Sequence, residues 1–143
     1  MIEDIRFTKE HEWVIIKKEG LAVIGISDFA QRQLGDIVSI ELPRVGSKFS
    51  YMQAMAIIDS VKASSDIYSA LSGEVVEVND GLLEHPEWIN QSPYELGWIV
   101  KMKPSNIENE QQQLESLMTN EQYNKFVGEL EKKENDDDDK RAG

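Results

Sequence analysis

Lys62 is an isolated lysine among small and apolar residues in the stretch "IIDSVKASSDIYSALSGEVVEV", residues 57–78. Its nearest charged neighbours are Asp59 and Asp66, in a chain of which 29% is charged. A modifying enzyme can therefore reach the amine without steric or charge interference. Acylation would remove the charge and make the side chain part of a long tether, as in group-carrying proteins. The pattern favours a modification site over the simpler interpretation, a solvated lysine in a turn.

The residues around Lys62 predict the tip of a β-hairpin. Residues 51–59 form a strand-like run that leads to the lysine, and residues 66–71 lead away from it. Residues 74–79 alternate apolar and polar side chains again after a Ser-Gly turn. A lysine at such a tip exposes its amine to solvent, where other proteins can bind it.

Other segments predict short elements of the same kind. Residues 13–26 indicate a hairpin with a glycine in its turn, and Ser27 is placed to cap a short helix that Gly35 can end. Residues 36–42 and 98–103 are typical of further strands, each followed by a proline. Short strands at close spacing predict a mainly β fold with flanking α, a small barrel or sandwich of antiparallel strands.

In the C-terminal part of the sequence, the apolar residues change from strand-like alternation to helical spacing. Thr119 and Gln122 fit a capping box, and apolar residues follow at helical intervals up to Leu130, so we expect two C-terminal helices packed on the sheet. Residues 1–131 therefore form the predicted domain. Residues 132–143 contain the run "ENDDDDKRAG" and predict an acidic disordered tail, either native or the remnant of a protease-cleavage tag.

Composition excludes several function classes. The net charge of −12 with scattered basic residues argues against nucleic-acid binding. No run is long enough to span a membrane, and the N-terminus lacks a secretory pattern. The chain has no cysteine, hence no thiolate metal site. We expect a bacterial or archaeal cytoplasmic protein, or one of the mitochondrial matrix if the chain is a mature eukaryotic one.

The usual catalytic motifs are absent from the sequence. It contains no GxGxxG, P-loop, nucleophile elbow or HExxH pattern, and His11 and His85 lie in different segments without ligand spacing. Both histidines are therefore assigned structural or solvated roles, and no metal site is expected. A Schiff-base role for Lys62 ranks last, because Asp59 and Asp66 favour the charged amine.

Five motifs together resemble the lipoyl-carrying H-protein family of the glycine cleavage system. They occur in the family's order over about residues 7–127 and read "FTKEHEWV", "VIGISDFAQRQLGDIVSIELPRVG", "DSVKASSDIYSALSGEVVEVN", "INQSPYELGW" and "LESLM". The third is the most specific, because it contains the surroundings of the lipoylated lysine. The resemblance implies a barrel-sandwich of the lipoyl/biotinyl-carrier type and a carrier protein rather than an enzyme.

The resemblance also implies a cofactor, partners and site residues. Lys62 would carry a covalent lipoyl group, attached by a lipoate ligase or lipoyltransferase, and Glu12 and Asp66 match positions that contact the loaded arm in a surface cleft. A pyridoxal-phosphate-dependent glycine decarboxylase (P protein) would load an aminomethyl group. A folate-dependent aminomethyltransferase (T protein) would unload it, and dihydrolipoamide dehydrogenase (L protein) would reoxidise the arm. We expect a monomer that binds neither nucleic acid nor membrane.

Two positions depart from the family pattern. Phe29 stands where the family often has histidine, so no polar role is carried over to it. Asp59 stands three residues before Lys62, where glutamate is usual, which keeps the charge but shortens the side chain. We expect neither change to prevent lipoylation, although Asp59 can alter recognition by a particular ligase.

Two other kinds of carrier protein also use a lysine at a hairpin tip. A biotinyl carrier usually has methionine on both sides of the modified lysine, whereas Val61 and Ala63 flank Lys62 here. A lipoyl relay or store that donates lipoyl groups to other complexes needs the same lysine. It differs in not needing the carboxylates Glu12 and Asp66.

Overall fold

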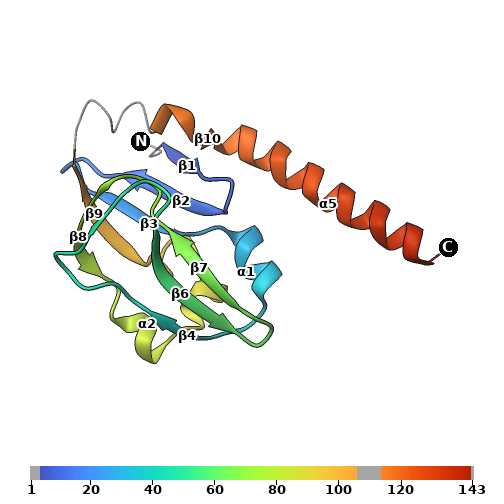
Figure 1. Ribbon diagram of the computed structural model, residues 1–143, viewed down its shortest axis with the longest axis horizontal. Coiled ribbons are helices and arrows are strands. Elements are labelled where there is room, and N and C mark those ends of the chain that lie inside the picture. The colour runs from blue at the N-terminus through green and yellow to red at the C-terminus, as the bar shows by residue number, and fades with distance from the viewer. Residues whose placement is uncertain (1–3, 106–113, 143) are drawn as a thin grey trace.

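The computed structural model describes residues 4–105 and 114–142, with side chains up to residue 134, as two antiparallel sheets and a long C-terminal helix (Figure 1). The larger sheet has the strand order β10-β1-β2-β3-β9-β8-β5 and the smaller one β4-β6-β7. The predicted mainly β class, with short antiparallel strands and helix packed on them, is confirmed. Among the described residues, no helix is both long and apolar enough to cross a membrane.

The strands are short, and their bounds follow the turn residues of the sequence. In the larger sheet they are β1 (Ile5–Phe7), β2 (Glu12–Ile16), β3 (Ala22–Ile26), β5 (Lys48–Phe49), β8 (Gly73–Val78), β9 (Val100–Pro104) and β10 (Met118–Thr119). In the smaller sheet they are β4 (Ile37–Glu41), β6 (Ala54–Ser60) and β7 (Ser64–Tyr68). The predicted hairpins are present as β2–β3 and β6–β7.

The inner faces of both sheets share one apolar core. Its fully buried members include Ile24 of β3, Ile58 of β6, Val75 of β8 and Met102 of β9. A second cluster joins the outer face of β1 and β2 to the C-terminal helix through Phe7, Trp13, Val23 and Tyr123. The main core holds the strands of the β6–β7 hairpin in place, and the turn of this hairpin projects beyond the core.

Helix α1 (Asp28–Leu34) begins and ends where the sequence predicts. The Ser27 hydroxyl accepts a hydrogen bond from the Ala30 backbone N–H at 3.1 Å, and Gly35 ends the helix with φ of 76°. A left-handed φ of this kind suits glycine, which has no Cβ to clash. The helix ends beside the β6–β7 turn, since a Cβ added at Gly35 would lie 3.4 Å from Cε of Lys62 and 3.5 Å from Cγ2 of Val61.

Two short helices occupy the segment between β8 and β9, part of which the sequence alone indicates as loop. These are α2 (Gly81–Glu84) and α3 (Trp88–Gln91). Each buries one apolar side chain, Leu82 and Ile89 respectively, in the main core. Burial of these side chains stabilises single helical turns that have little propensity of their own.

The C-terminal helix α5 (Asn120–Ala142) starts at the predicted capping box. The Gln122 backbone N–H donates to the Thr119 hydroxyl at 3.2 Å, and the Gln122 side chain accepts from the Thr119 N–H at 2.9 Å. The other predicted C-terminal helix falls partly on residues 106–113, which lie outside the described residues. Residues 114–116 are helical.

Helix α5 continues to Ala142 in the structure, whereas the sequence predicts a disordered tail over residues 132–143. The helix formers of residues 129–134 extend the preceding turns, which favours continuation. The run of four aspartates at 136–139 does not favour it, because aspartate has a low intrinsic helix propensity. The disordered tail, as a unit separate from the domain, stays a prediction.

Removal of residues 135–143 is expected to leave the melting temperature unchanged within about 2 °C, because these residues are too polar to bury much apolar surface. The measurement is thermal unfolding of the full chain and the truncated chain, followed by circular dichroism. The far-ultraviolet signal before unfolding also reports how much helix the truncation removes. A large drop in melting temperature would show that the segment is part of the folded domain.

Candidate functional site

Lys62 lies at the tip of the β6–β7 hairpin, in the turn formed by residues 61–63, as the sequence predicts. The Ser60 hydroxyl organises this turn, because it accepts the backbone N–H of Lys62 and of Ala63, both at 3.1 Å. The Ser60 N–H in turn donates to the Ala63 carbonyl at 2.9 Å. The lysine side chain is exposed, so its amine is available to a modifying enzyme.

Asp59 is engaged within the hairpin. Its carboxylate accepts hydrogen bonds from the Ser39 hydroxyl at 3.1 Å and from the Ser64 hydroxyl. It therefore ties β4 and β7 to β6 just below the turn. The shorter side chain at this position is compatible with an ordered hairpin.

A groove of about 350 Å³ lies between α1, β7 and α5. Its apolar lining residues are Ile26, Phe29, Ala30, Leu34, Ile67 and Leu130. Its polar ones are Glu10, His11, Gln33, Ser65, Asp66 and Glu134. An apolar interior with three carboxylates suits a ligand that is a hydrocarbon chain ending in a cation.

Lys62 and this groove are linked through the end of α1. A Cβ placed on Gly35 would lie 3.4 Å from Cε of Lys62, so the lysine stem rests against the residue that follows Leu34. Leu34 itself lines the groove. An arm attached to the amine therefore starts beside the groove.

Asp66 and Glu12, the two carboxylates predicted to hold the arm, occupy different environments. Asp66 is exposed and lines the groove. Glu12 is 1% exposed and is not among the lining residues. The structure thus brings Asp66 to the groove surface and places Glu12 inside the protein.

Burial raises the pKa of Glu12 to about 7. Hydrogen bonds oppose this shift, since the Thr8 hydroxyl donates to Oε1 at 2.6 Å and the Tyr68 N–H donates to Oε2 at 3.3 Å. Tyr68 ends β7, the strand that carries Asp66, so Glu12 is connected to the groove wall. At neutral pH, Glu12 is present in both its neutral and its charged form.

His11 has a structural role, as the sequence analysis assigns. Its Nδ1 lies 2.8 Å from the Tyr123 hydroxyl, which also contacts the Ser27 hydroxyl at 2.6 Å, and its ring packs on Phe29 and Phe126. His11 has φ of 75°, which is uncommon for a residue with a side chain. These contacts join α5 to α1 and hold two walls of the groove together.

Several groove residues were not identified from the sequence, namely Glu10, Leu130 and Glu134. They come from the β1–β2 turn and from α5, and only the tertiary fold brings them to Asp66. Within the described residues, no group of three or more His, Asp or Glu side chains is arranged to hold a metal. His85 is exposed and pairs with Glu87, with Nδ1 and Oε1 3.0 Å apart.

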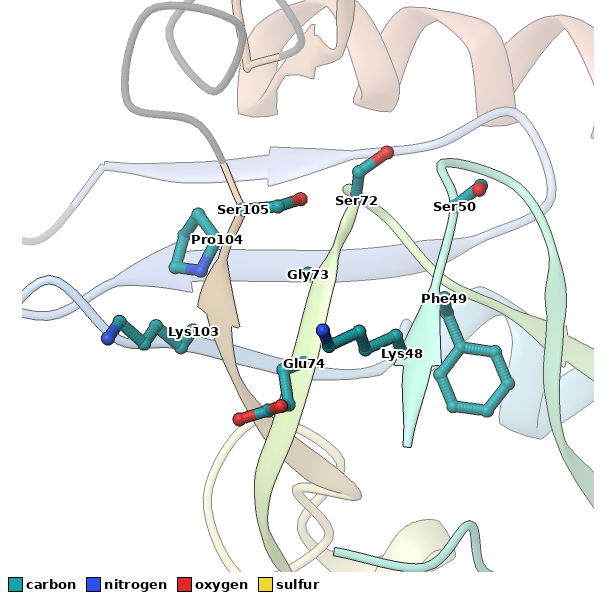
Figure 2. Close-up of a pocket in the computed structure, with 9 residues that line it drawn as sticks. All are labelled: Lys48, Phe49, Ser50, Ser72, Gly73, Glu74, Lys103, Pro104 and Ser105. Carbon is teal, nitrogen blue, oxygen red and sulfur yellow. The ribbon is translucent and has the colours of Figure 1, made fainter. Parts of the chain in front are cut away.

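A larger hollow of about 470 Å³ lies elsewhere, at the ends of β5, β8 and β9 (Figure 2). Figure 2 shows that its charged side chains are Lys48, Lys103 and Glu74, with serines around its upper part. None of the predicted site residues lines it. Its size alone does not connect it with Lys62.

A small β fold that presents an exposed lysine on a tight hairpin, beside an acidic groove with an apolar interior, defines a carrier domain for a covalently attached arm. An exposed lysine of this kind is suited to covalent attachment, and the groove has a lining suited to part of a long arm.

Comparison with known proteins specifies the class further. The family model described as glycine cleavage H-protein matches residues 5–130. The chain is 43% identical to the glycine cleavage system H protein of Halothermothrix orenii, over 90% of this chain and 97% of that protein. It is 44% identical to the probable H protein of Thermococcus gammatolerans, over 90% and 92% of the two chains. The chain therefore belongs to the glycine cleavage H-protein family.

A solved structure agrees with the sequence comparisons. The crystal structure of a glycine cleavage system H protein from Mycobacterium marinum superposes with a TM-score of 0.78 and 30% identity, and covers 90% of this chain and 99% of the other. The chain is thus a lipoyl-bearing carrier that shuttles the aminomethyl group of glycine. It is a non-catalytic component of the glycine cleavage system. Family membership also disfavours the biotinyl-carrier alternative and the Schiff-base alternative.

Proposed function

We propose that Lys62 is the lipoyl attachment site, and that the loaded arm folds back into the groove with its ammonium group at Asp66. The observation that carries this proposal is the position of the exposed lysine beside the end of α1, the helix whose last residue, Leu34, lines the groove. The groove interior suits the hydrocarbon part of the arm, and its carboxylates suit the cation at the end.

The groove also gives a chemical reason for holding the arm. Water can hydrolyse an aminomethyl sulfide, and an arm seated in a largely apolar groove is less exposed to it. Release then requires a partner that competes for the arm. The carrier thereby keeps its cargo between two enzymes.

The proposed partners are those of the family. Glycine decarboxylase loads the arm, the folate-dependent aminomethyltransferase unloads it, and dihydrolipoamide dehydrogenase restores the disulfide. A lipoate ligase or lipoyltransferase attaches the arm to Lys62. We further propose that the protein acts as a monomer in the cytoplasm. The bacterial and archaeal source of its relatives favours the cytoplasm over the mitochondrial matrix.

Replacement of Asp66 by asparagine is expected to shorten the lifetime of the aminomethyl group about two- to fivefold, because it removes the charge from an exposed charge-assisted contact. Lipoylation of Lys62 should stay unchanged, since the lipoyl group is uncharged. The measurement is loss of the aminomethyl group from loaded protein with no partner present.

Asp80→Asn is the matched control, because Asp80 is exposed, lies outside the groove and makes no side-chain cap bond. Equal lifetimes for wild type and Asp66→Asn would remove Asp66 from the proposed site. A lipoylated wild type that glycine decarboxylase cannot load would contradict the shuttle and favour the lipoyl relay.

A further inference from the structure

Asn90, on α3, makes hydrogen bonds to the residues on both sides of Asp36, which lies in the loop between α1 and β4. Its side-chain N–H donates to the Gly35 carbonyl at 2.9 Å, and its side-chain oxygen accepts from the Ile37 backbone N–H at 2.9 Å. The same amide nitrogen is 3.0 Å from Oε1 of Gln31 on α1. Asn90 therefore fixes the residues on both sides of Asp36.

Asp36, held between these two bonds, contacts the hairpin tip. Its carbonyl accepts the backbone N–H of Val61 at 3.0 Å, and Val61 directly precedes Lys62. This bond continues the β4–β6 pairing, which reaches the tip at Ile37 and Ser60. The loop held by Asn90 is thus the tertiary support of the lysine-bearing turn.

The lysine stem rests on the same loop. Cε of Lys62 lies 3.4 Å and Cδ 3.8 Å from the position that a Cβ on Gly35 would occupy. Gly35 is the residue whose carbonyl Asn90 binds. A shift of this loop would therefore move both the backbone before Lys62 and the surface under its side chain.

We propose that Asn90 is a positioning residue for the arm: it clamps residues 35–37 so that the side chain of Lys62 leaves the turn toward the groove. The inference rests on the proposed attachment of the lipoyl group to Lys62. The mechanism is indirect, because the hydrogen bonds of the Asn90 side chain go to residues 31, 35 and 37 and none of these three residues lines the groove.

Asn79 provides a matched control within the same chain. Its side-chain N–H groups donate to the carbonyls of Leu96 and Trp98, both at 2.8 Å, so it also anchors a loop through two backbone contacts. That loop does not support the hairpin tip. A general loss of stability would therefore affect Asn79→Ala as well as Asn90→Ala.

The first measurement is amide hydrogen exchange at Val61 in the unmodified protein. Asn90→Ala should raise the exchange rate about fivefold or more, because the loop that accepts the Val61 N–H loses its anchor. Asn79→Ala should leave this rate unchanged. The second measurement is the lifetime of the aminomethyl group on loaded protein, which Asn90→Ala should shorten and Asn79→Ala should not.

A second variant tests the same clamp if Asn90→Ala folds poorly. Asn90→Asp keeps an acceptor for the Ile37 N–H but places a carboxylate oxygen against the Gly35 carbonyl. When protonated, the introduced carboxyl group can donate to that carbonyl, so Val61 protection should recover as the pH falls. Asp28, which accepts from the Gln31 amide, is present in every variant, as are Asp36 and Lys62. Each variant is compared with wild type at the same pH, so the titration of these shared groups affects both proteins.

Two results would overturn the inference. One is equal Val61 exchange in Asn90→Ala and Asn79→Ala, and the other is an unchanged aminomethyl lifetime in Asn90→Ala. Failure of the proposed function gives a different result. A wild type that a ligase does not modify at Lys62 would contradict the attachment site, while faster Val61 exchange in Asn90→Ala would still support the clamp on the turn.

Discussion

A Lys62→Arg variant is expected to accept no lipoyl group, whereas a Lys18→Arg variant is modified like wild type. Arginine keeps the positive charge and a stem of similar length, but its guanidinium is not the primary amine that a ligase acylates. Because the change is conservative in charge and the residue is exposed, the fold should be unaffected. We therefore expect Lys62→Arg to lose lipoylation completely, because the acceptor amine is absent and not because the fold has changed.

The measurement is intact mass after treatment with a lipoate ligase, followed by peptide mapping of the modified chain. Lys18 is a suitable control, because it is an exposed lysine in the turn of the other hairpin, β2–β3. It lacks the turn geometry that the Ser60 hydroxyl gives to Lys62. Modification that persists in Lys62→Arg, or that disappears in Lys18→Arg, would contradict the assignment.

The parts of the fold that the sequence predicts are those set by neighbouring residues. The cap at Ser27, the helix end at Gly35 and the capping box of Thr119 and Gln122 all depend on contacts three or four residues apart. The Lys62 turn is of the same kind, because Ser60 and Ala63 close it. Local signals of this sort can be recognised without the tertiary structure.

The groove depends on long-range contacts, which local patterns do not contain. Glu134 joins Asp66 in the groove lining because α5 follows β10, which pairs with β1. Glu10 reaches the same groove from the β1–β2 turn. The role of Asn90 is hidden for the same reason, since its partners lie more than fifty residues earlier in the chain. An asparagine in a segment that the sequence indicates as loop gives no sign of which backbone groups it binds.

The burial of Glu12 is the least expected feature of the site. Glu12 lies at the start of a strand, between a histidine and a tryptophan. From the sequence it is expected to be solvated, because carboxylates are rarely fully buried. Here the Thr8 hydroxyl and the Tyr68 N–H satisfy its oxygens, which makes burial tolerable. As a consequence, the carboxyl group of Glu12 lies behind the groove wall and has a pKa of about 7.

This pKa gives the predicted role of Glu12 toward the loaded arm a distinctive pH dependence. Glu12 is neutral below about pH 7 and charged above it. Only the charged form attracts the ammonium of the aminomethyl group, because a neutral carboxyl group has no net charge to pair with it. If Glu12 contributes to holding the arm, its contribution must therefore appear as the pH rises through this value.

We expect the ratio of aminomethyl lifetimes, wild type over Glu12→Gln, to be near one well below pH 7 and to rise to about tenfold well above it. The ratio removes the intrinsic pH dependence of hydrolysis, which both proteins share. Glutamine preserves the size of the side chain and removes its charge. Glu84→Gln, an exposed change outside the groove, should give a ratio that is flat with pH. A flat ratio for Glu12→Gln, in a protein whose Glu12 titrates near 7 by carbon NMR, would show that the buried carboxylate does not reach the arm and that the groove holds its cargo without it.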